Sequence, residues 1–233
     1  MTNLAQRLAA VQQRITDAAI SAGRGPNQVT LVVVTKNHPA QLAVDLLDIG
    51  VNQFGENRDQ EAAPKAAEIA IERPGAAVDW HFVGQLQSNK VKSVLGYASS
   101  IHSLDRLSLL QALTKETGKL AQTQGFETID VFIELNLTDD PNRGGIAPAQ
   151  LSEFAQQVLQ VPTLNLRGVM GVASLEANPE PDFETIAVAS QSLQKLAPNA
   201  KFISAGMSND FELAISYGAT HVRVGTAITG KRL

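Results

Sequence analysis

The chain has 233 residues, 44% of them hydrophobic, which is enough for one large buried core, so we expect a single domain over residues 1–233. It contains no cysteine, which excludes disulfides, thiolate metal sites and thiol nucleophiles and fits a reducing compartment. A net charge of −4 with both signs mixed along the chain argues against a dedicated nucleic-acid surface. No apolar run approaches a membrane span, so we expect a soluble cytoplasmic protein.

The first 24 residues place Leu4, Leu8, Val11 and Ile15 at helical spacing, which predicts a surface helix rather than a signal peptide. Eight short apolar runs bounded by turn residues then predict buried parallel strands. These runs are residues 30–36, 53–56, 79–84, 100–104, 130–136, 166–172, 201–206 and 221–225. The clearest amphipathic segments between them are residues 39–50, 106–122, 147–160 and 181–197.

Eight strands that alternate with helices predict a closed (β/α)8 barrel of the TIM type, with one extra helix at the N-terminus. An open doubly wound sheet is the alternative, but no Gly-x-Gly-x-x-Gly turn follows the first strand. In a barrel the side chains at the C-terminal ends of the strands meet at one mouth, where function concentrates. The residues that end each predicted strand are therefore the candidates for a functional site.

Lys36 closes the apolar run TLVVVTK, which ends the first predicted strand. If apolar neighbours desolvate this amine, its pKa falls and the neutral form can attack an aldehyde to give a Schiff base. A solvated lysine at the end of a strand is the alternative interpretation of the same pattern.

The loops after the last two strands carry groups that suit an anion. Ser208, in the turn GMSND, can offer a hydroxyl and free backbone amides, although it can equally be the N-cap of the helix FELAIS. Gly225 and Thr226 form a second turn with two more amides and another hydroxyl. Two adjacent donor turns predict a site for a phosphate monoester.

Arg223 lies in the otherwise apolar last strand, where a guanidinium needs an acceptor. If the ligand is pyridoxal 5'-phosphate (PLP), the acceptor is the pyridine nitrogen. Arginine can only donate there, so the nitrogen would stay unprotonated and carbanion chemistry would be disfavoured. An ion pair with a neighbouring carboxylate is the alternative.

Other polar residues allow a structural and a functional interpretation. Asn57 with Gln60 fits a capping box, but its amide could also contact a cofactor at the mouth. Lys90 and Lys92 stand in the predicted first turn of a helix, where the helix dipole disfavours cations, which indicates a nearby anion or two solvated side chains. Arg143 is a loop cation that meets either a second anion or water.

The motifs LVVVTK, FGEN, WHFVGQLQSNK, IHSLD, GVMGV, GMSNDFELAI and HVRVGTAITG resemble, in order and over nearly the whole chain, the YggS/PROSC family of pyridoxal phosphate homeostasis proteins. The resemblance implies a single barrel similar to the N-terminal domain of alanine racemase, with PLP held as an exposed Schiff base. It implies Lys36 as the Schiff-base lysine, Arg223 as the pyridine contact, and Ser208, Gly225 and Thr226 as phosphate contacts. Asn57 and Met170 are implied as neighbours of the ring.

The resemblance further implies a non-catalytic role in balancing vitamin B6 with amino and keto acids, and it allows PLP transfer to PLP-requiring apoenzymes. Alanine racemases use two bases, one of them a tyrosine from a second domain, whereas this sequence holds only Tyr97 and Tyr217, neither at a predicted strand end. We therefore expect no enzyme activity, no metal and a monomer that binds neither nucleic acid nor membrane. A small PLP-dependent racemase and a barrel enzyme for a phosphorylated substrate are the alternatives.

Overall fold

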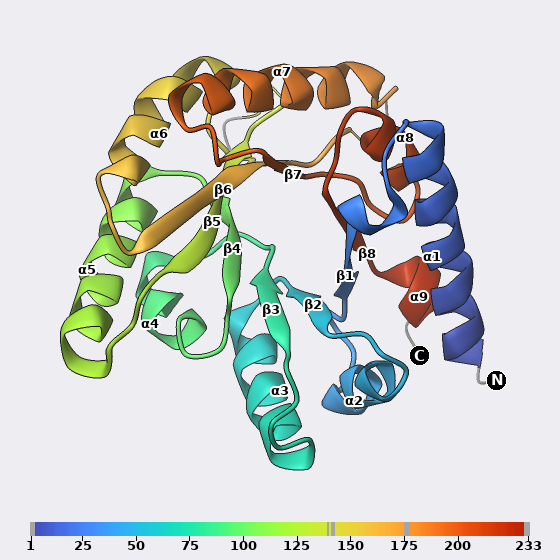
Figure 1. Cartoon of the computed structure of the whole chain (residues 1–233). Helices are drawn as coiled ribbons and strands as arrows, with labels where there is room; N and C mark the ends of the chain where they lie inside the picture. Colours follow the sequence, from blue (N-terminus) through green and yellow to red (C-terminus); the bar gives the residue numbers. More distant parts are fainter. Residues whose placement is uncertain (1–2, 139, 141–142, 175–177, 231–233) are drawn as a thin grey trace.

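The structure, a computed structural model, describes residues 3–138, 140, 143–174 and 178–230 and contains a closed barrel of eight parallel strands paired in chain order (Figure 1). The strands are β1 Thr30–Val34, β2 Gln53–Glu56, β3 Asp79–Phe82, β4 Ser100–Leu104, β5 Ile129–Leu135, β6 Leu164–Gly171, β7 Phe202–Ser204 and β8 His221–Val224. The register of β1 with β8 closes the ring, from Thr30 opposite His221 to Val33 opposite Val224. The predicted barrel is confirmed and the open sheet is wrong.

The strand positions agree with the sequence pattern, but several strands end earlier than predicted. The first stops at Val34, two residues before Lys36, and the chain then turns at Asn37, which takes a left-handed conformation with φ 60°. The seventh strand has only three residues, and the glycine that follows it, Gly206, also has a positive φ. The mouth is therefore built from turns rather than from extended strand ends.

Helices surround the barrel as an outer ring (Figure 1). The α-helices are α1 Asn3–Ser21, α2 Ala40–Asp48, α3 Asp59–Glu72, α4 Val91–Val94, α5 Leu107–Gln124, α6 Leu151–Leu159, α7 Glu180–Leu196, α8 Phe211–Ser216 and α9 Thr226–Thr229. Three single turns of 3-10 helix are η1 Pro26–Gln28, η2 Ser88–Lys90 and η3 Pro148–Gln150. Each long helix buries an apolar stripe on the strands, as Leu109, Leu110 and Leu113 do in α5.

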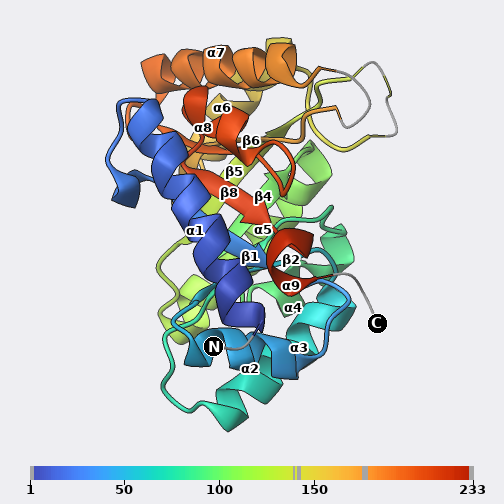
Figure 2. The same cartoon turned by 90° about the vertical axis from the view of Figure 1, so that its right-hand side faces the viewer.

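The extra N-terminal helix α1 runs along the outside of the barrel beside α8 and α9 (Figure 2). It buries Leu8, Val11 and Ile15, three of the four positions named from the helical spacing, together with Ala19, while Leu4 is half-buried. Arg14 pairs with Glu212 of α8 at 2.5 Å. The predicted surface helix is confirmed. Within the described residues, no helix combines the length and hydropathy that a membrane crossing requires.

Candidate functional site

An open pocket of about 390 Å³ lies at the C-terminal ends of β1 and β8. Val34, Val83, Val172 and Met207 give it apolar walls. Six of the seven predicted cofactor-binding residues line it, namely Lys36, Asn57, Ser208, Arg223, Gly225 and Thr226, together with Asn209 and Asp210. The barrel thus gathers the pocket lining from six separate stretches of sequence, as expected for the functional mouth of this fold.

Lys36 differs from expectation in its surroundings. The side chain is exposed in the turn after β1 rather than buried among apolar neighbours. The desolvated amine that the sequence suggested is therefore not observed. The turn is fixed by bonds from the Asn37 backbone N–H to Glu61 Oε2 at 2.8 Å and from the His38 N–H to the Thr35 carbonyl at 3.2 Å. Lys36 is thus an accessible amine at the pocket edge, held on an ordered backbone.

The buried lysine of this region is Lys65, on α3. Its Nζ donates to the Thr35 carbonyl at 2.9 Å and pairs with Glu56 Oε1, while the Thr35 hydroxyl donates to the same carboxylate at 2.7 Å. All three residues are at most 5% exposed, and together they anchor the chain immediately before Lys36. Sequence reasoning missed this support, although Lys65 interrupts the apolar stripe that Ala62 and Ile69 form on α3.

Donors for an anion also line this pocket. The hydroxyls of Ser208 and Thr226 lie 3.4 Å apart, and Gly225 precedes Thr226. Within the described residues, the backbone N–H groups of Ser208, Asn209 and Thr226 have no hydrogen-bond partner. Free amides and hydroxyls in one concave place suit a phosphate group.

The alternative role of Ser208 as a helix cap is wrong. The N-cap of α8 is Asp210, whose carboxylate instead accepts the Met207 N–H at 2.5 Å. This contact closes the turn on itself and leaves the Ser208 hydroxyl facing Thr226.

Asn57 does not form the predicted capping box either, because α3 begins at Asp59 with Arg58 as its N-cap and no side chain caps it. The position of Asn57 depends on Gly84, which follows β3. A Cβ at Gly84 would lie 2.3 Å from the Asn57 carbonyl oxygen, so only glycine allows this approach. Asn57 is thereby held at the pocket wall with its side chain free of hydrogen bonds to the described residues.

Arg223 is 5% exposed, and its partners are neutral oxygens rather than a carboxylate, so the predicted alternative of an ion pair is wrong among the described residues. Its Nη1 donates to the Ser204 carbonyl at 2.7 Å and to Ser204 Oγ at 2.6 Å, and its Nη2 donates to the Gly171 carbonyl at 2.9 Å. Burial lowers the pKa of Arg223 to about 10, against the opposing charges of Glu134 and Asp210. The guanidinium is therefore still a cation at neutral pH.

Met170 is the one predicted site residue that does not line this pocket. It is 1% exposed on β6, where it pairs with Ser204 of β7. Its neighbour across β5 is Glu134, whose pKa is raised to about 7 by burial and by Asp105. Neither residue lines the pocket.

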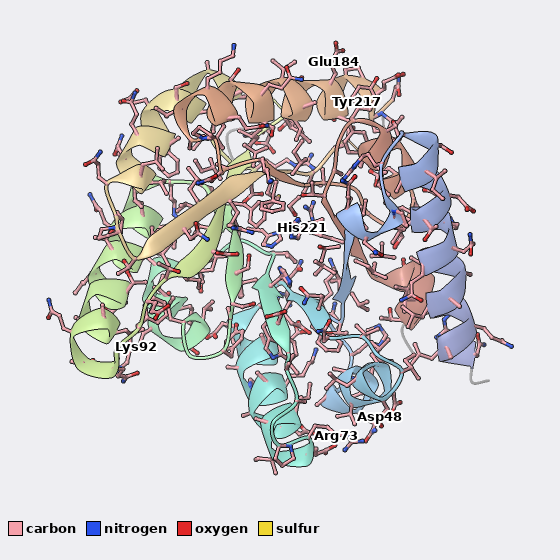
Figure 3. The ribbon with its side chains drawn as sticks, viewed as in Figure 1. Asp48, Arg73, Lys92, Glu184, Tyr217 and His221 are labelled. Atoms are coloured by element: carbon pink, nitrogen blue, oxygen red, sulfur yellow. The ribbon has the colours of Figure 1, made fainter. Side chains whose placement is uncertain are left out.

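The predicted cations outside the pocket have protein partners or face outward. Lys90 lies 3.8 Å from Asp59, so the nearby anion is a carboxylate of α3. Lys92 is exposed on α4, on the outside of the barrel (Figure 3). Arg143 donates to the Val172 carbonyl at 3.4 Å, behind one apolar wall of the pocket.

The donor set fits PLP. The accessible amine of Lys36 suits the aldehyde of PLP, and the hydroxyls and free amides suit its phosphate. The buried guanidinium of Arg223 has N–H groups left to donate, which suits the ring nitrogen. Val34 and Val172 are apolar lining residues that would suit the ring of PLP. In the described part of the chain, no cluster of three or more His, Cys, Asp or Glu side chains could hold a metal ion.

Comparison with known proteins agrees with this geometry. The family model for the alanine racemase N-terminal domain matches residues 6–232. Pyridoxal phosphate homeostasis proteins of Escherichia coli K12 and Mycobacterium leprae are each 37% identical to this chain. The alignments cover 100% and 98% of this chain and 98% and 93% of those proteins, respectively.

Among solved structures, PipY of Synechococcus elongatus PCC7942, determined with PLP bound, superposes with a TM-score of 0.83 and 32% identity over 98% of this chain and 100% of that one. Alanine racemase of Corynebacterium glutamicum shares the fold, with a TM-score of 0.68 and 14% identity over 97% of this chain and 61% of its own. The chain therefore belongs to the alanine racemase N-terminal domain family and, within it, to the pyridoxal phosphate homeostasis proteins.

Proposed function

We propose that this protein binds PLP in the pocket at the mouth of the barrel and holds it as a Schiff base on Lys36. Bound PLP supplies an electrophilic aldehyde carbon, and we assign the reaction with it to the amine of Lys36, which is exposed and lines the pocket. Phosphate contacts are assigned to Ser208, Gly225 and Thr226, and the ring nitrogen contact to Arg223. The observation that carries the proposal is the convergence of these groups on one pocket.

The ring neighbours differ in their support. Asn57 lines the pocket with a free amide, so we assign it a direct contact with the ring substituents. Met170 is buried and does not line the pocket, so we assign it apolar packing near the ring rather than a polar contact.

We further propose that the role is non-catalytic, namely the balancing of PLP supply against amino and keto acids. Arg223 cannot give a proton to the ring nitrogen, which disfavours carbanion chemistry. Neither tyrosine lines the pocket: the Tyr97 hydroxyl donates to Asp59 at 3.5 Å, and that of Tyr217, labelled in Figure 3, donates to Glu180 at 2.8 Å. Both contacts argue against a tyrosine as the second base of a racemase.

An exposed Schiff base also suits transfer of PLP to apoenzymes, which we propose as transient partners of a cytoplasmic monomer. Because Lys36 stands at the open edge of the pocket, an incoming amine can reach the same carbon without displacing a buried segment.

Titration of the purified protein with PLP, followed by absorbance between 300 and 500 nm, tests the binding proposal. A protonated Schiff base absorbs near 420 nm, so a saturable band there at one PLP per chain is expected. Absence of the band with PLP in excess would contradict it. In a parallel racemisation assay with L-alanine and other amino acids, the loaded protein should show no turnover. Turnover at enzymatic rates would contradict the non-catalytic role and support the alternative of a racemase.

A further inference from the structure

A continuous line of polar side chains, buried except for the half-buried Gln53, crosses the interior of the barrel and ends at Arg223. His81 Nε2 is 2.7 Å from Gln53 Oε1, His81 Nδ1 is 2.9 Å from His102 Nε2, and His102 Nδ1 is 2.8 Å from Ser204 Oγ. Ser204 Oγ then accepts from Arg223 Nη1 at 2.6 Å. We call these five residues the polar column. Gln53 begins β2, so the column runs from the N-terminal end of the strands to the pocket.

The direction of every hydrogen bond in the column follows from the contact between Gln53, where the column begins, and Asp79. Asp79 is a carboxylate and only accepts, so the Gln53 amide nitrogen donates to it and the Gln53 oxygen faces His81. His81 must then donate from Nε2, which leaves its Nδ1 as an acceptor. His102 consequently donates from Nε2 and accepts at Nδ1, and the hydroxyl of Ser204 donates to it.

The histidines keep this order because they stay neutral. Burial lowers the pKa of His81 to about 4 and that of His102 well below its usual value. His221, labelled near the centre of the ring in Figure 3, lies beside both imidazoles with ring centroids 6.2 and 6.1 Å away, and burial lowers its pKa to about 3. A protonated imidazole would have no acceptor atom, and the chain of bonds would break.

At the pocket end of the column, Ser204 fixes the orientation of the Arg223 guanidinium. The Ser204 proton is committed to His102, so the lone pairs of Ser204 Oγ remain to accept from the guanidinium. Ser204 is 0% exposed and does not line the pocket, so it cannot touch a ligand there. Any influence of Ser204 on binding must pass through Arg223.

We propose that Ser204 and His102 are positioning residues, which act through the polar column to hold the Arg223 guanidinium against the ring nitrogen of PLP. This inference rests on the proposed PLP site. It predicts that Ser204→Ala weakens PLP binding about 10- to 100-fold, the range for one hydrogen bond to a charged group. The loss should disappear with 1-deaza-PLP, whose ring carries CH in place of nitrogen, because that analogue lacks the atom that Arg223 meets.

The matched control is Ser103→Ala. Ser103 is also a serine of a barrel strand with 0% exposure, but its hydroxyl has no partner among the described residues and lies outside the column. His102 offers a second test. The oxygen of His102→Asn can replace Nδ1 as acceptor for Ser204 and should retain binding, whereas His102→Leu should match Ser204→Ala. Thermal unfolding of each variant shows that it is folded before binding is measured.

Spectroscopic titrations of these variants with PLP and with 1-deaza-PLP separate the outcomes. A loss that is specific to PLP in Ser204→Ala and His102→Leu supports the column. Equal losses for both ligands, or binding by Ser204→Ala equal to that of Ser103→Ala, would overturn it. If the unchanged protein and Ser103→Ala both fail to bind PLP, the proposed function itself is wrong.

Discussion

Two lysines near the mouth have opposite surroundings. Lys36 is exposed at the edge of the pocket, while Lys65 is buried against Glu56 and the backbone of Thr35. A buried ion pair of this kind holds a unique local arrangement, and removal of one partner costs about 3–5 kcal/mol. We therefore assign reactivity to the exposed lysine and structural support to the buried one.

The hydroxyl of Ser208 has no capping role, so its loss should affect the ligand more than the fold. Ser208→Ala is expected to weaken PLP retention by roughly 1–3 kcal/mol, the range for a hydrogen bond to a charged group. Equilibrium dialysis of the loaded protein measures the effect. Ser216→Ala is the control, since Ser216 lies on the same turn-helix unit but donates only to the Leu213 carbonyl. Equal retention by both variants would show that Ser208 makes no phosphate contact.

Glu134 gives the protein a pH dependence with a definite sign. Burial and Asp105 raise its pKa from 4.5 to about 7, so the folded state holds a proton that the unfolded state releases between these values. Its contribution to stability is full below pH 4.5 and is lost as the pH rises to about 7. A Cβ at Gly144 would lie 3.4 Å from an Asp105 carboxylate oxygen and 3.5 Å from one of Glu134, so both acids face this loop.

Glu134→Gln removes that titration. The unfolding free energy of the variant relative to the unchanged protein should therefore rise by roughly 1–3 kcal/mol from pH 4.5 to 7 and stay level above pH 8. Urea unfolding at a series of pH values measures the difference. Glu127→Gln, at an exposed position before β5, should show no such rise. A flat difference for Glu134→Gln would contradict the raised pKa.

At the scale of elements, the mouth depends on the contact between the turns after β2 and β3. Gly84 packs on the Asn57 backbone with no room for a side chain, whereas a Cβ at Gly118, inside α5, would have nothing within 4 Å. Close backbone packing therefore requires glycine at position 84, whereas nothing in the described structure requires glycine at position 118.

Gly84→Ala should destabilise the protein by about 1–3 kcal/mol through overpacking and should also weaken PLP binding, because Asn57 must move. Gly118→Ala should stabilise it by about 0.5–1 kcal/mol, since alanine favours a helix interior, and should leave binding unchanged. Urea unfolding with PLP titration compares the pair. Normal PLP affinity in a destabilised Gly84→Ala protein would show that Asn57 does not contact the ligand.

At the scale of the whole molecule, the alternation of apolar runs and amphipathic segments was sufficient to predict the barrel, because parallel strands buried on both faces form continuous apolar runs. The strand ends were less predictable. The run at residues 30–36 gives no sign of an early end to the strand. The chain nevertheless turns at the left-handed Asn37, and Lys36 is exposed, which the sequence pattern did not predict.

The pocket residues were largely predictable, because the C-terminal ends of parallel strands converge. Their supports were not. Ser204 and His102 are 102 residues apart in the sequence, yet they form a hydrogen bond of 2.8 Å. A contact over this sequence distance cannot be predicted from local spacing. Lys65 was detectable in principle as a cation on an apolar helix stripe, but its partner carboxylate on β2 appears only in the folded barrel.

Borohydride reduction of the PLP-loaded protein followed by peptide mapping tests whether Lys36 holds PLP covalently. We expect one reduced adduct per chain, on Lys36. We also expect a Lys36→Ala protein that folds with its unfolding free energy changed by less than about 0.5 kcal/mol, because the side chain is exposed, and that carries no adduct. A reduced adduct on Lys65 or another lysine, or an adduct that persists at the native ratio in Lys36→Ala, would show that Lys36 is not the Schiff-base lysine.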